Sequence, residues 1–182
     1  MFFSKIAVIL SVAASALAMP AGLEAHKQQQ KRAGVLSVQD YSQFQVSDGV
    51  AGNALAEVQA KFPIDESDLA SVDPNDLAII QAARKTAEAA ETDTGGFNDA
   101  IKAAGSGSNS SADALSVGKI KNKVLKLKLE VLGLQIDQAI NDKDNSAKIA
   151  AETTKLNKNV QLDQDAAGQA SQSVDFSGDD SP

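Results

Sequence analysis

Four carboxylates stand close together between two expected helices, at Asp65, Glu66, Asp68 and Asp73. Paired carboxylates can cleave a glycosidic bond, one acting as acid and the other as base or nucleophile. Residues 64–72, however, form a polar connector without aromatic side chains that could hold a sugar. We therefore interpret the cluster as a solvated acidic loop. The sequence predicts no catalytic residue here.

Nucleophilic and metal-binding side chains are scarce. The chain has no Cys, and its one His, His26, lies near the N-terminus. His26 is therefore the one residue that could serve Ser-His-Asp or Cys-His catalysis, or a zinc site built from His or Cys. No glycine-rich phosphate loop or nucleophile elbow is present. We predict that the protein is not an enzyme and that it uses no cofactor.

Residues 142–146 (DKDNS) begin like a calcium-binding loop. Such a loop requires a glycine for its sharp turn and a closing glutamate. Ala147 and Thr153 stand at those two positions. The sequence therefore predicts no metal site.

A dense run of lysines is the most distinctive charged feature. Lys119, Lys123 and Lys126 share one face if the run is helical. One interpretation is a patch for anionic lipid, glycan or the acidic surface of a partner. The other is a solvated face that lies against acidic helices of the same protein, and this second interpretation is preferred.

These lysines belong to the longest apolar-periodic run, residues 116–140. One stripe at helical spacing comprises Ile120, Val124, Leu127, Val131 and Leu134; a second comprises Leu125, Leu129, Leu132, Ile136 and Ala139. A narrow polar line holds Lys121, Lys128 and Gln135. A helix that is apolar on two sides must be covered on two sides. We therefore expect a central helix over about residues 114–140.

The flanking patterns complete an all-α prediction, a single bundle of four to five helices around that central helix. Expected helices are Asp48–Phe62, Pro74–Glu91, Phe97–Ala104, Ala114–Ile140 and Ala147–Leu162, within residues 33–163. Tyr41 and Phe44 are expected to fill one end of the core. Residues 164–182 are predicted to be a polar, flexible tail, with Val174 and Phe176 clipping back onto the bundle as the alternative.

The N-terminus has the features of a secretory leader. Lys5 precedes an apolar run, and a small-x-small pattern ends at Ala18, so residues 1–18 are predicted to be a signal peptide. Residues 19–32 are predicted to be a propeptide, because they end in Lys31-Arg32, a dibasic pair that processing proteases cut. An ordinary charged pair in a loop is the alternative. Cleavage after Arg32 would begin the mature chain at Ala33.

Charge and composition limit the partners. The formal net charge is −7, and removal of residues 1–32, which carry +3, takes it to about −10. That acidity argues against nucleic acid as a partner, and the leader is too short to span a bilayer comfortably. Without Cys the fold has no disulfide and must rely on its core. Asn109 begins the only Asn-x-Ser/Thr sequon, on an expected polar loop, and is a candidate for glycosylation. We expect a monomer.

Three segments resemble a family of small secreted proteins of filamentous ascomycete fungi. They are residues 41–55 (YSQFQVSDGVAGNAL), residues 118–127 (GKIKNKVLKL) and residues 168–176. The resemblance covers nearly the whole expected mature chain. It implies no activity that can be assigned to individual residues. Members of the family are often regarded as candidate effectors of host-associated fungi, so it implies an extracellular location.

Two functions follow as expectations. The first is a secreted, non-enzymatic interaction protein, a candidate fungal effector that acts on a host or cell-wall protein or glycan. The alternative is a binder of hydrophobic ligands or surfaces in the cell wall or extracellular space. That alternative requires a cavity beside Leu125, Leu129 and Leu132.

Overall fold

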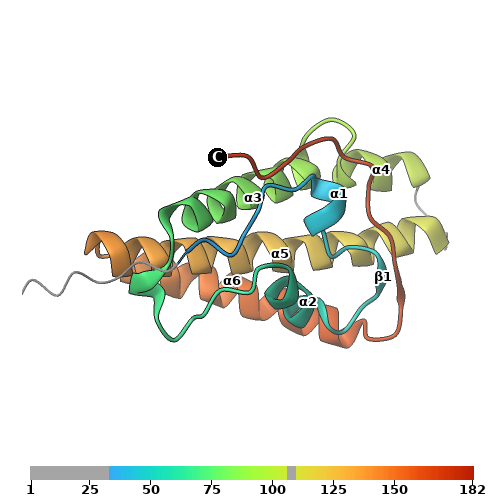
Figure 1. Ribbon diagram of the computed structural model, residues 1–182. Coiled ribbons are helices and arrows are strands. Elements are labelled where there is room, and N and C mark those ends of the chain that lie inside the picture. Colours follow the sequence, from blue (N-terminus) through green and yellow to red (C-terminus); the bar gives the residue numbers. More distant parts are fainter. Residues whose placement is uncertain (1–32, 106–109) are drawn as a thin grey trace, which may run out of the picture.

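A computed structural model describes residues 33–105 and 110–182. Its centre is the helix α5, Ser110–Asn141, which is 32 residues long. Helix α3 (Pro74–Thr92) lies along one side of α5 and α6 (Ser146–Asp165) along the other (Figure 1). The short helices α2 (Ala54–Lys61) and α4 (Phe97–Ala104) also contact α5. The predicted all-α bundle around a long central helix is confirmed.

Both apolar stripes of α5 contribute to the core. In the first, Val124, Leu127 and Val131 are buried, and in the second, Leu125, Leu129, Leu132 and Ile136 are buried. The covering face of α3 is built from Ile80, Ala83, Ala87 and Ala90, all fully buried. Because alanines dominate that face, the α3 and α5 backbones can approach closely.

Local signals set the ends of several helices. Pro74 occupies the first position of α3, and the Asp73 carboxylate accepts a hydrogen bond from the Asn75 amide at 2.8 Å, as an N-cap does. Helix α4 begins at Phe97 and ends at Ala104, as predicted, and is followed by Gly105 in a left-handed conformation (φ 85°).

The second helix is shorter than the sequence indicates. We predicted a helix from Asp48 to Phe62, but α2 begins only at Ala54. Gly49 and Gly52 have φ values of 86° and 116°, which a continuing right-handed helix excludes. This segment instead contains the short strand β1, Gly49–Val50, which pairs antiparallel with β2, Ala170–Ser171.

The C-terminal segment packs against the bundle. We predicted a flexible tail over residues 164–182, and the structure instead shows the alternative, in which Val174 and Phe176 pack back onto the bundle. After β2, the Gln172 amide donates to the Ala114 carbonyl at 3.0 Å and the Ser173 amide to Asp48 Oδ1 at 2.8 Å. The chain then runs over α3 beside the N-terminal segment (Figure 1). Polar, small residues misled the prediction because the contacts are largely backbone hydrogen bonds, which composition does not reveal.

Four aromatic rings pack together in the core, where the N-terminal and C-terminal segments meet. Tyr41 and Phe44, in the single-turn helix α1 (Tyr41–Phe44), are 1% exposed and meet edge to face at 5.5 Å. Phe176 packs on Tyr41 at 5.8 Å, and Phe62 packs on Phe44 at 6.0 Å. The C-terminal segment is therefore anchored by an aromatic side chain as well as by its backbone. The 3-10 helix η1 (Leu69–Ser71) lies in the connector before α3.

Candidate functional site

The predicted lysine patch surrounds a carboxylate of the same protein. Lys126, Lys123 and Lys119 of α5 place their Nζ atoms 2.8, 3.3 and 4.0 Å from the Glu91 carboxylate on α3. Burial by itself would raise the pKa of Glu91. The hydrogen bond and charge of Lys126, together with Lys123, outweigh that effect and hold its pKa below the ordinary value. The arrangement has the geometry of an internal ion-pair cluster between two packed helices.

A different lysine is the most deeply buried cation in the described residues. Lys121, expected on the polar line of the central helix, is 0% exposed. Its Nζ atom donates to the carbonyls of Asp48 and Val50 at 2.9 and 3.0 Å and pairs with Glu57 Oε2 at 2.9 Å. An ammonium has three donors, and all three are used. Lys121 therefore ties β1 and α2 to the central helix.

The second lysine of that line is also buried. Lys128 is 8% exposed and pairs with Glu66 Oε1 at 2.6 Å. Glu66 belongs to the acidic connector, which we expected to be solvated. The connector is thus fixed to α5 by at least one ion pair, and its Asp73 serves as the cap of α3.

Three buried aspartates hold backbone segments in place, and the sequence analysis missed all three. Asp76 is 2% exposed and accepts from the Val35 and Leu36 amides, each at 2.9 Å. Asp163 of α6 accepts from Gly52 and Ala54 at 3.0 and 2.8 Å, so it caps the start of α2 from another helix.

The third, Asp180, is 2% exposed and accepts from the Gln39 amide at 2.5 Å. Desolvation raises the pKa of Asp180 and the hydrogen bond from Gln39 lowers it, while the nearby charges of Asp179 and Asp40 raise it further. The net result is a raised pKa, so neutral pH places a disfavoured charge in this contact.

Another polar network lies inside the aromatic cluster. The Tyr41 hydroxyl donates to Asn122 Oδ1 at 2.9 Å, and Asn122 Nδ2 donates to the Ala87 carbonyl at 2.7 Å. Burial, together with the nearby charge of Asp48, raises the pKa of Tyr41 to about 12. The phenol therefore stays neutral and works as a structural donor.

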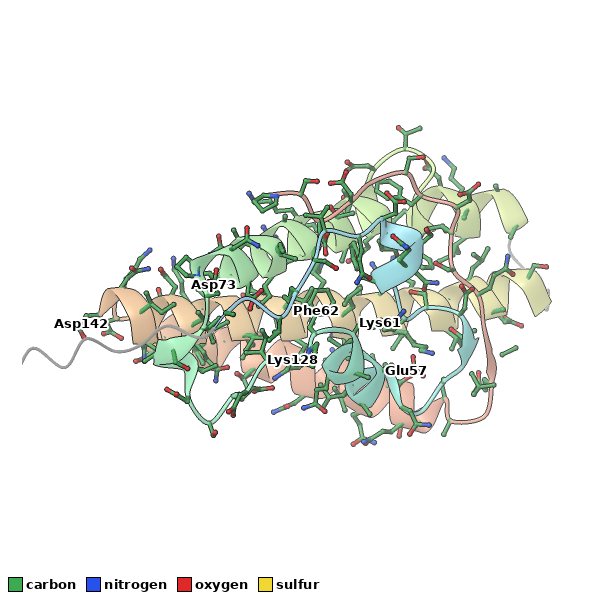
Figure 2. All side chains as sticks on the ribbon, viewed as in Figure 1. Glu57, Lys61, Phe62, Asp73, Lys128 and Asp142 are labelled. Atoms are coloured by element: carbon green, nitrogen blue, oxygen red, sulfur yellow. The ribbon has the colours of Figure 1, made fainter. Side chains whose placement is uncertain are left out.

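An open groove of about 560 Å³ lies between residues 45–50 and α2. Its lining comprises the apolar or small residues Val46, Gly49, Val50 and Ala60 and the polar residues Gln45, Asp48, Glu57 and Lys61. We call it the α2 groove. Glu57 and Lys61 are one turn apart on α2, as Figure 2 shows. Val50 is 53% exposed.

The wall of the α2 groove is fixed from within. Lys121 Nζ donates to the Asp48 and Val50 carbonyls from the core side. Gln45 Nε2 donates to Asp48 Oδ2 at 2.7 Å. Lys61 Nζ donates to the Gln43 carbonyl. These contacts give the groove its shape without a bound molecule, which lowers the entropic cost of binding.

The leucines of the second stripe of α5 are packed in the core. Leu125, Leu129 and Leu132 are at most 1% exposed and belong to the core cluster. Leu129 also borders a small hollow of about 70 Å³ that is lined mainly by polar residues such as Gln81, Arg84 and Asp137. A cavity beside these leucines would favour a hydrophobic ligand, and the hydrophobic-binder function stays a prediction.

Three of the predicted site residues lie outside the residues that the structure describes. They are Ala18, Arg32 and Asn109. Within residues 33–105 and 110–182, no group of three or more His, Cys, Asp or Glu side chains is placed to hold a metal ion. In the same ranges, no helix combines the length and apolar character that crossing a bilayer requires.

Comparison with known proteins gives one match. A family model described as a domain of unknown function (DUF8454) matches residues 36–175, which include all of the helices described above. Neither a curated protein nor a solved structure matches the chain.

Proposed function

This chain belongs to the DUF8454 family, and from that premise we propose that it is a secreted, non-enzymatic interaction protein whose α2 groove binds a partner. The observation that carries the proposal is the groove itself. It is open, it is partly apolar, and its walls are fixed by Lys121. The buried charged residues, in contrast, are occupied in holding the fold.

The groove indicates the chemistry of the partner. Asp48 contributes a negative charge to the lining and Lys61 a positive one, whereas the charge of Glu57 is balanced by its ion pair with Lys121. Val50 and Ala60 supply exposed apolar surface between them. A short extended segment of a protein, with one basic and one apolar side chain, complements both features. A glycan fits less well, because no aromatic ring lines the groove to stack on a sugar.

The compartment rests on the N-terminal sequence. The predicted signal peptide places the partner outside the cell, and the resemblance to small secreted fungal proteins makes a host extracellular protein or a fungal wall protein the class to search. A role as an effector is the host-directed form of this proposal.

The test uses a displayed library of short peptides and the chain from Ala33 onward. Enriched peptides should carry a basic residue beside an apolar one. Val50→Lys should weaken their binding at least tenfold, because it removes apolar contact and repels the basic residue. Val38→Lys is the matched control, since Val38 is 51% exposed and lies outside the groove. A library without enrichment, or equal losses for both variants, would refute the groove as the binding site.

A further inference from the structure

The first described residues are tied to the start of α3. Asp76 Oδ2 accepts from the Val35 amide at 2.9 Å, and Oδ1 accepts from the Leu36 amide at 2.9 Å. Ala33 and Gly34 are exposed, so the segment lies on the surface while its anchor Asp76 is buried. Cleavage after Arg32 would make Ala33 the N-terminal residue. Ala33 is two residues before Val35, whose amide contacts the buried Asp76 carboxylate.

The chain passes close to the Asp76 carboxylate and to the Cβ atom of Asp73 at this point. A Cβ atom placed on Gly34 would lie 3.1 Å from Asp76 Oδ1 and 3.8 Å from the Asp73 Cβ atom. Ala33 directly precedes Gly34, and consecutive Cα atoms are about 3.8 Å apart, so Ala33 is the next residue along the chain from this contact. Within residues 33–105 and 110–182, no ion pair joins Asp73 or Asp76 to a cation.

We propose that proteolysis between Arg32 and Ala33 creates an α-ammonium that pairs with Asp76 and Asp73 and locks the N-terminal segment onto α3. An endoprotease that cleaves after paired basic residues supplies the catalysis, and water is the co-reactant. The amide bond breaks, Arg32 keeps the new carboxylate, and the released amine of Ala33 takes up a proton. The inference concerns processing and does not depend on the α2 groove.

Cleavage changes the charge at this site. Before hydrolysis the Ala33 nitrogen is a neutral amide, whereas a free α-amine has an ordinary pKa of about 7.7–8 and is mostly protonated at neutral pH. The positive end of the α3 dipole opposes a cation there, but it amounts to about half a charge against two carboxylates. The contact therefore favours the ammonium form, and it exists only in the processed chain.

The first experiment establishes the cut. The N-terminal sequence of the protein secreted from its own host should begin at Ala33, and a Lys31→Gln, Arg32→Gln double variant should retain the longer N-terminus. A native protein that begins at Met19 would overturn the proposal.

The second experiment measures the contact in the chain from Ala33 onward. The α-amine pKa, followed by NMR, should lie about one pH unit or more above the ordinary range. The amine form should also unfold at higher denaturant than its N-acetylated counterpart. Because a raised pKa stabilises below the unfolded value, this difference should be complete below about pH 7 and should disappear as pH rises through the raised pKa. An ordinary amine pKa, with equal midpoints for the two forms, would overturn the proposal.

Variants identify the carboxylates. Asp73→Asn keeps a good N-cap and should lower the α-amine pKa, and Asp76→Asn should lower it further. Asp175→Asn is the control, because Asp175 is exposed and lies in the C-terminal segment. An amine pKa that responds equally to all three substitutions would count against the proposed pair. If Asp76→Asn does not fold, the pKa in the unsubstituted chain and in Asp73→Asn still decides the outcome.

Discussion

The Nζ atom of Lys121 lies 2.9 Å from Glu57 Oε2, although Lys121 is fully buried within the helix that forms the core. The same atom binds two carbonyls of the strand segment, at Asp48 and Val50. Strand, short helix and central helix therefore meet at one ammonium group. The Val50 carbonyl of β1 is therefore satisfied from the core side.

Lys121→Ala should be strongly destabilising, although Lys121 lies on the narrow polar line of the central helix. Removal leaves two partly buried carbonyls without a donor and Glu57 without its partner, which should cost about 3 kcal/mol. Lys121→Met fills the space but donates nothing, so most of the loss should persist. Lys119→Ala, 4.0 Å from Glu91 and partly exposed, should cost less than about 0.5 kcal/mol. Urea denaturation midpoints of the three variants measure this, and a small loss for Lys121→Met would assign the effect to packing instead.

Leu127→Ala and Leu132→Ala test the two-sided core. The residues lie on different stripes of α5 and are 7% and 1% exposed. Each substitution should cost about 2–5 kcal/mol, because the packed neighbours only partly fill the space left behind. Chemical denaturation of both variants provides the measurement. A loss below about 1 kcal/mol at either site would contradict burial of that stripe.

Periodicity predicted the central helix because burial of a stripe is encoded locally, every three or four residues. The same periodicity, applied to polar residues as well, would have predicted that several residues missed by the sequence analysis are buried. Lys121 continues the stripe of Leu125 and Leu129, and Asp76 continues the face of Ile80 and Ala83. A charged residue in register with an apolar stripe is buried with a partner, and that partner is distant in sequence.

The distance in sequence explains what could not be predicted. Asp163 caps α2 from a position 109 residues beyond Ala54, and Asp180 meets Gln39 across 141 residues. No local pattern encodes such hydrogen bonds, because they depend on how the helices pack. The same holds for the α2 groove, whose shape follows from the left-handed glycines Gly49 and Gly52 and from Lys121.

Gly118→Ala should destabilise the protein, although alanine normally favours a helix by up to about 1 kcal/mol over glycine. A Cβ atom at Gly118 would lie 2.0 Å from the Gln172 carbonyl oxygen, so the C-terminal segment must move away from α5. Gly133→Ala is the control, since its nearest side-chain atoms would lie at 3.8 Å, and it should stabilise. Unfolding midpoints, together with hydrogen exchange at Gln172, report the result. A stabilising Gly118→Ala with unchanged exchange would contradict the close packing.

Two carboxylates should give opposite pH signatures. The pKa of Glu91 is lowered in the folded protein, so its contribution is present above the unfolded pKa, near 4.3, and is lost as pH falls through the folded value. The pKa of Asp180 is raised, so its favourable contribution is present below the unfolded pKa, near 3.9, and is lost as pH rises through the folded value.

Glu91→Gln should therefore be less stable than the unsubstituted protein at pH 7 and approach it at pH 3. Asp180→Asn should be more stable at pH 7 and approach it at pH 3, because the amide oxygen can still accept from Gln39. Denaturant midpoints of both variants across this range decide the matter, and an Asp180→Asn variant that loses more stability at pH 7 than at pH 3 would show that the charged carboxylate is favoured in its contact.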